Sequence, residues 1–163
     1  MKRAALTIIL ALATLIAVTP LRAQQTQGTL QMAGNRWPAA ASAYSFSVIN
    51  LPVLISVPGE PYSNEIYLNM IAKNGVVTVS VIGLDGIVSP AVVTSSTFNP
   101  TATSGTLSLT FTTTANLASD GLVDDVATFT VPLVTWTITR PCPRCNPQTQ
   151  ITSFREGTYA FLH

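Results

Sequence analysis

The chain has 163 residues, of which only 9% are charged, and its formal net charge is +1. About a quarter of the residues of an ordinary soluble domain are charged, so this composition is unlike that of a typical cytosolic enzyme. Hydrophobic residues make up 47% of the chain, and an uncharged run rich in them lies near the N-terminus.

Residues 1–23 have the pattern of a secretory signal peptide. A basic start precedes an uncharged run rich in Leu, Ile and Ala at residues 4–18, and Ala23 supplies a small residue for cleavage. The run is shorter than the roughly 18 residues that cross a bilayer. We therefore expect cleavage after Ala23, no transmembrane segment in the mature chain, and a location in the cell envelope or outside the cell.

Cleavage would remove three of the eight basic residues and none of the seven acidic ones, leaving a formal net charge of −2. A sparse and slightly negative surface cannot neutralise many phosphates, and released counterions are the main source of affinity for nucleic acid. Nucleic acid is therefore not an expected partner. The remaining length suits one domain that folds without a disulfide framework.

Alternating apolar residues predict an all-β protein. Ser and Thr supply 33 of the 140 residues after Ala23, and Thr and Val favour strands. The alternation runs through residues 44–48, 53–57, 66–70, 77–81, 107–111 and 129–138. Turn-forming pairs such as Asn74-Gly75 and Asp85-Gly86 separate these runs. About seven short strands of this spacing favour an antiparallel β-sandwich over residues 44–140.

The flanking segments and one irregularity complete this prediction. Apolar residues occupy odd positions up to Leu133 and even positions from Val134, so we expect a β-bulge at residues 132–134. Residues 24–43 have weak periodicity and are expected to form an extended leader. Residues 141–163 are expected to form a separate C-terminal tail.

Four segments carry a resemblance to a known family. They are residues 76–84 (VVTVSVIGL), 96–100 (STFNP), 105–113 (GTLSLTFTT) and 127–131 (ATFTV). In this order they resemble the immunoglobulin-like modules of secreted and surface bacterial proteins, over about residues 44–139. The resemblance implies an immunoglobulin-like β-sandwich with an accessory, adhesive or spacer role. The family usually has a Tyr shortly after the Gly that matches Gly121, and no Tyr follows it here.

Cys142 and Cys145 form a C-x-x-C motif and are the two cysteines of the chain. In an exported protein the expected state is an oxidised pair that closes a short loop. One alternative is a thiol–disulfide protein, because this spacing can lower the pKa of a thiol. Another is a metal-binding protein, in which the pair supplies two of the four ligands of a zinc ion. His163 could be a third ligand only if the tail folds back.

Asp120, Asp124 and Asp125 form an acidic cluster whose carboxylates are candidate calcium ligands. Their spacing differs from that of a calcium-binding loop and favours a solvated turn.

Two aromatic residues in loop-like contexts, Trp37 and Tyr62, are candidates for a surface contact. Trp136 alternates with apolar residues, which predicts a core position.

A single His and scattered carboxylates form no recognisable catalytic triad, so we expect neither an enzyme nor a cofactor. We expect a noncatalytic secreted or envelope module with a structural, adhesive or protein-binding role, whose partner is a protein, a cell surface or a second copy. Self-association could occur by strand addition of the leader or tail, because few charges protect the sheet edges. An eight-stranded outer-membrane barrel also fits the length and alternation, but scarce aromatic residues and repeated prolines disfavour it.

Overall fold

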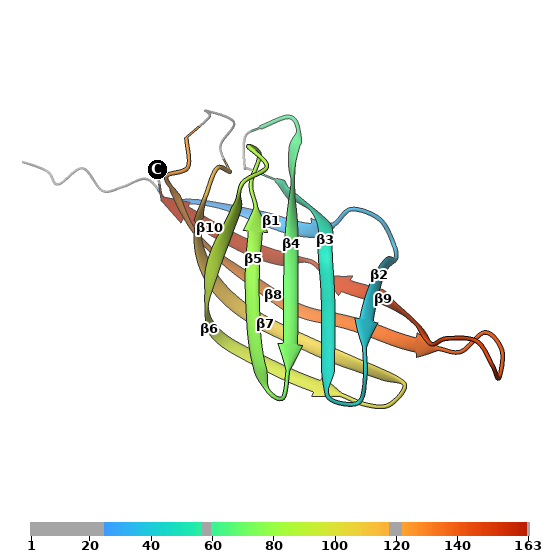
Figure 1. The fold of residues 1–163 in the computed structure, drawn as a ribbon. Coiled ribbons are helices and arrows are strands. Elements are labelled where there is room, and N and C mark those ends of the chain that lie inside the picture. Colours follow the sequence, from blue (N-terminus) through green and yellow to red (C-terminus); the bar gives the residue numbers. More distant parts are fainter. Residues whose placement is uncertain (1–24, 57–59, 118–121, 163) are drawn as a thin grey trace, which may run out of the picture.

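The computed structural model describes residues 25–56, 60–117 and 122–162, and these ranges form ten strands and no helix. The strands are β1 (Gln25–Met32), β2 (Trp37–Ala41), β3 (Ser45–Ser56), β4 (Ser63–Lys73), β5 (Val76–Ile82), β6 (Val88–Pro100), β7 (Ser104–Ala115), β8 (Asp125–Thr139), β9 (Gln148–Arg155) and β10 (Gly157–Leu162) (Figure 1). All strand pairs are antiparallel, which confirms the prediction of an all-β antiparallel fold. No helix that is long and apolar enough to span a membrane occurs in these ranges. The predicted signal peptide lies outside them.

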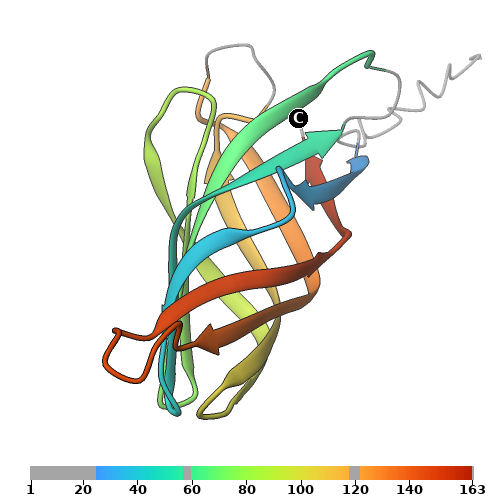
Figure 2. The same cartoon turned by 90° about the vertical axis from the view of Figure 1, so that its right-hand side faces the viewer.

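The ten strands form one sheet that curves back on itself. Strands β3 to β8 pair in chain order. Strands β1 and β10 join the two ends of this series, because β1 pairs with β3 and with β10, and β10 pairs with β8. Strands β2 and β9 make a similar connection between β3 and β8. Figure 2 shows the strands wrapping around a common interior. The expected two separate sheets of about seven strands are not seen.

The expected boundaries at residues 44 and 140 also differ from the structure. Residues of the predicted leader form β1 and β2, and residues of the predicted tail form β9 and β10, all within the same sheet. The sequence signal is weak here because Gly28 and Gly157 occupy positions where an alternating strand would place an apolar side chain. Each glycine faces a large partner across the β1–β10 pair, Tyr159 and Leu30 respectively.

The sheet opens between β5 and β6. These strands pair only at residues 80–82 and 88–90, and β6 then curves away from β5 (Figure 1). Pro90 is the last residue of β6 that pairs with β5, and it lacks the N–H that would continue the β5–β6 ladder. From residue 91 onward, β6 pairs with β7 alone.

The interior is apolar and is organised around two groups of stacked aromatic rings. The rings are Phe46, Trp136 and Phe98 in one group, and Phe111, Phe129 and Tyr159 in the other. Trp136 is fully buried, and its ring centroid lies 4.1 Å from that of Phe46. The predicted core position of Trp136 is therefore confirmed.

Two local predictions are confirmed by the backbone. The β7–β8 register shifts between Leu107 and Leu109, which pair with Val134 and Val131, so two residues of β8 face one residue of β7. This is the predicted bulge, and it accommodates Pro132 without a missing ladder bond. The Asn74-Gly75 turn joins β4 to β5 with positive φ at both residues, as a tight hairpin turn requires.

Candidate functional site

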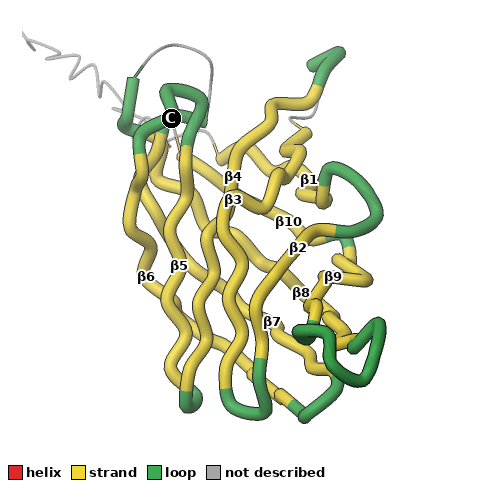
Figure 3. The backbone as a smooth tube through the Cα atoms, turned by 45° about the vertical axis from the view of Figure 1, so that its right-hand side comes forward, coloured by secondary structure: helices red, strands yellow, loops and turns green. Residues whose placement is uncertain are grey.

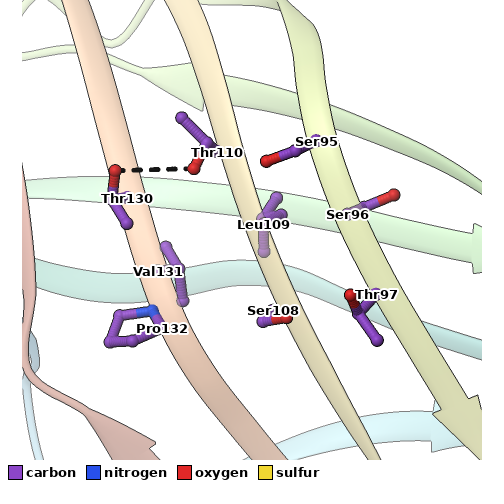
Figure 4. A pocket seen from close by; sticks show the side chains of 9 residues that line it. All are labelled: Ser95, Ser96, Thr97, Ser108, Leu109, Thr110, Thr130, Val131 and Pro132. Atoms are coloured by element: carbon purple, nitrogen blue, oxygen red, sulfur yellow. Dashed lines mark hydrogen bonds between the residues drawn. The ribbon is translucent and has the colours of Figure 1, made fainter.

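A row of hydroxyl side chains crosses six neighbouring strands on the outer face of the sheet. In order across the strands it consists of Ser56 (β3), Thr29 (β1), Thr158 (β10), Thr130 (β8), Thr110 (β7) and Ser95 (β6). Side-chain hydrogen bonds join Thr29 to Ser56, and Thr110 to Thr130 at 3.5 Å (Figure 4). We call these six residues the hydroxyl row.

Further hydroxyl groups extend this surface beside the row. Thr112 and Thr128 face each other on β7 and β8, and their hydroxyl oxygens lie 3.1 Å apart. Such cross-strand Thr pairs stabilise a sheet by a few tenths of a kcal/mol to about 1 kcal/mol each. The face of β7 and β8 is therefore a hydrogen-bonding surface held in register by its own side chains.

Two shallow depressions lie along the hydroxyl row. The first, about 260 Å³ in volume, includes Ser95, Thr110 and Thr130 in its lining (Figure 4). The second, about 410 Å³, includes Thr29, Thr130 and Thr158. No charged residue lines either depression. Because Thr130 borders both, they offer a partner one neutral surface with hydroxyl donors and acceptors.

The sequence produces this surface through alternation and bulges. On β7, Leu107, Leu109 and Phe111 point into the core, so the intervening hydroxyl residues face outward. The bulge on β8 lies at the edge of the first depression, since Pro132 is part of its lining. A second register shift, between Val93 and Ser95 on β6, lies at the opposite side. Bulges bend and twist the strands that carry them, which accounts for the concave surface.

A glycine shapes the second depression. Gly28 pairs with Tyr159 across β1 and β10, and a Cβ added to Gly28 would lie 2.6 Å from the Tyr159 ring. The ring thus packs against glycine backbone, and Gly28 and Tyr159 both belong to the lining of the depression. Any larger residue at position 28 would collide with the backbone carbonyl of Ser56 and with this ring.

The predicted acidic cluster is divided by the structure. Asp120 lies outside the described residues, Asp124 is exposed, and Asp125 is buried at the start of β8. The Oδ2 atom of Asp125 accepts a hydrogen bond of 2.9 Å from the backbone N–H of Leu117. Within the described ranges no three His, Cys, Asp or Glu residues come together as a metal site. Asp125 therefore fixes the backbone at Leu117, two residues beyond the end of β7.

Tyr159 is the group whose titration the fold changes most clearly. Burial of its hydroxyl raises the pKa of Tyr159 to about 12, and the negative charge of Asp125 adds to this shift. Both effects disfavour the phenolate. The phenol therefore stays protonated throughout the physiological range.

Cys142 and Cys145 form a disulfide in the loop between β8 and β9, with their Cα atoms 5.0 Å apart. The backbone N–H of Cys145 donates to the carbonyl of Cys142 at 3.1 Å, so a turn brings the two residues together. Figure 3 shows this loop projecting from the strands. The described ranges contain no helix, whereas redox C-x-x-C motifs typically begin a helix.

The two predicted contact aromatics lie in different settings. Trp37 is half-buried, packs against the core, and donates its indole N–H to the carbonyl of Ile49 at 3.2 Å. Tyr62 is 63% exposed between β3 and β4. Neither belongs to the hydroxyl row, which sequence reasoning missed. The abundance of Ser and Thr in the sequence indicated a hydroxyl-rich surface. The alignment of the six residues into one row depends on strand register, which the sequence does not show.

No protein-family model, curated protein or solved structure matches the chain. The resemblance to immunoglobulin-like modules therefore stays a prediction from motifs.

Proposed function

We propose that the protein is a noncatalytic exported module with a structural, adhesive or protein-binding role, and that it makes contact through the hydroxyl row. The continuity of this row over six strands is the observation that carries the proposal. The likeness of its motifs to the immunoglobulin-like modules of secreted and surface bacterial proteins points to the same kind of role.

The chemistry of the surface supports contact with a neutral polar partner. Hydroxyl groups both donate and accept hydrogen bonds, and they can match the hydroxyl or amide groups of a polysaccharide or protein surface. The depressions along the row carry no charge, so binding there should depend little on ionic strength. An open, shallow surface of this kind suits adhesion to an extended partner better than enclosure of a small substrate.

Cosedimentation with cell-envelope fragments from the source cells tests the proposal. We expect the protein to sediment with the fragments to the same extent at low and high salt. The double variant Thr130→Lys/Thr158→Lys places two cations in the middle of the row, and we expect it to lower the bound fraction several-fold. Thr130 and Thr158 are exposed but directly opposite each other on β8 and β10, so circular dichroism of the variant must first show that the sheet is retained.

Gln150→Lys is the matched control, because Gln150 is exposed on β9 and lies outside the row. This variant adds one cation and should bind like the unaltered protein. Equal binding by the double variant, or binding that disappears at high salt, would contradict the proposal.

A second candidate is an exported thiol–disulfide or metal-binding protein that uses Cys142 and Cys145. The exposed position of the disulfide at the loop favours access by a redox partner or, after reduction, by a metal ion. Thiol titration separates the candidates. Two cysteines that react with a thiol reagent only after treatment with a strong reductant indicate a structural disulfide. A pair that is readily reduced and reoxidised indicates a redox function.

A further inference from the structure

Residues 91–100 of β6 form a free sheet edge. Strand β6 pairs with β5 only through residues 88–90, and residues 91–100 pair with β7 on one side alone. The backbone groups that point away from β7 are therefore available to another strand. Free edges of this kind are the sites at which a further strand can join a sheet.

The free edge has a protected part and an unprotected part. Pro90 and the register shift between Val93 and Ser95 interrupt its first residues, and both devices oppose strand addition. Residues 95–99 (SSTFN) then pair with β7 in regular register and contain neither a charge nor a proline. We call residues 95–99 the β6 edge.

Exposure of this segment agrees with its edge position. Thr94, Ser95, Ser96 and Thr97 are all exposed in succession, whereas a strand covered on one face alternates between buried and exposed. Association along the β6 edge would therefore pair backbone groups that have no strand partner on that side.

We propose that the β6 edge binds the β6 edge of a second copy of this chain, as an antiparallel pair about a two-fold axis. Any strand can pair with its own copy in this way, and the resulting interface is self-complementary. With Thr97 of each copy opposite its counterpart, Ser95 faces Asn99, and the sheet continues from one molecule into the other. Neutral Ser, Thr and Asn side chains can then form cross-strand hydrogen bonds.

Charge favours a second copy over a charged partner. The strand carries no charge from Val88 to Pro100, so two copies meet there without repulsion, and a charged partner would find no complementary ion. The inference concerns backbone groups at the sheet edge, whereas the proposed function concerns side-chain hydroxyls. Ser95 belongs to both surfaces, so dimerisation and envelope binding are measured separately.

Sedimentation velocity of the exported chain over a range of concentrations tests the inference. We expect a concentration-dependent dimer. Thr97→Lys would place two like charges directly opposite each other and should weaken dimerisation at least tenfold, and Thr97→Glu should do the same. An equimolar mixture of the two variants pairs opposite charges, so we expect it to restore the dimer.

Gln150→Lys is the control for added charge away from the edge, and it should dimerise like the unaltered chain. Circular dichroism of each variant checks that the sheet is retained. A chain that stays monomeric at high concentration would overturn the inference. So would unaltered dimerisation of Thr97→Lys, or a mixture of the Lys and Glu variants that stays monomeric.

Discussion

The indole ring of Trp136 on β8 packs against the backbone of Gly105, its antiparallel partner on β7. A Cβ at position 105 would lie 2.5 Å from the Cε2 atom of the ring, closer than van der Waals contact allows. The same relationship recurs between Gly28 and Tyr159. In both pairs the missing side chain gives a large aromatic ring its place in the interior.

Gly105→Ala should therefore destabilise the protein. Overpacking of a tight core costs about 1–3 kcal/mol, and the Trp136 ring must move to make room. Urea denaturation of both proteins measures the loss. In a Trp136→Phe background the smaller ring should reduce the cost of Gly105→Ala. An equal cost in the two backgrounds would show that the collision with Trp136 is not the cause.

Removing the Asp125 carboxylate should also lower stability. Asp125→Ala leaves the Leu117 N–H without its acceptor in a buried setting, which costs about 1–3 kcal/mol. Asp124→Ala is the matched control, because Asp124 is the preceding residue and is exposed. It should change the free energy of unfolding by no more than about 0.5 kcal/mol. Thermal or urea denaturation of the two variants side by side measures the contrast. Similar losses in both would contradict the assigned role of Asp125.

Stability should decrease at alkaline pH because the pKa of Tyr159 rises to about 12 on folding. The phenol of an unfolded chain has a pKa near 10. The stability that the protonated Tyr159 contributes is therefore fully present below pH 10 and is lost as the pH rises toward 12.

Tyr159→Phe should flatten the decrease, whereas Tyr44→Phe, at an exposed turn, should leave it unchanged. Free energies of unfolding in urea between pH 8 and about pH 11 test this prediction. A decrease of the same slope in the Tyr159→Phe variant would assign the pH dependence to another group.

Loss of the disulfide should affect stability modestly. Cys142 and Cys145 are three residues apart, and closing so short a loop removes little entropy from the unfolded chain. Cys142→Ser/Cys145→Ser should therefore lower the free energy of unfolding by no more than about 2 kcal/mol. Denaturation of the unaltered chain with and without reductant provides an independent measure. A loss well above this value would mean that the loop supports the β8–β9 pair.

Local patterns in the sequence predicted the elements that are built from neighbouring residues. The alternation of Leu107, Leu109 and Phe111 placed these side chains in the core, and the change of phase before Val134 located the bulge on β8. Asn74-Gly75 marked the turn between β4 and β5. These features follow from the period of a strand and from the backbone preferences of turn residues, which act over a few residues.

The sequence by itself thus determined an all-β antiparallel chain with low charge, a hydroxyl-rich surface and Trp136 in the core. Only the tertiary structure decided that residues 25–41 and 148–162 complete the sheet and that the hydroxyl row aligns across six strands. It also decided that residues 91–100 of β6 pair with a strand on one side alone. The physical reason is that pairing partners such as Thr29 and Thr158 are far apart in the chain. Their register is set by long-range backbone hydrogen bonds and by glycine–aromatic contacts that no local pattern records.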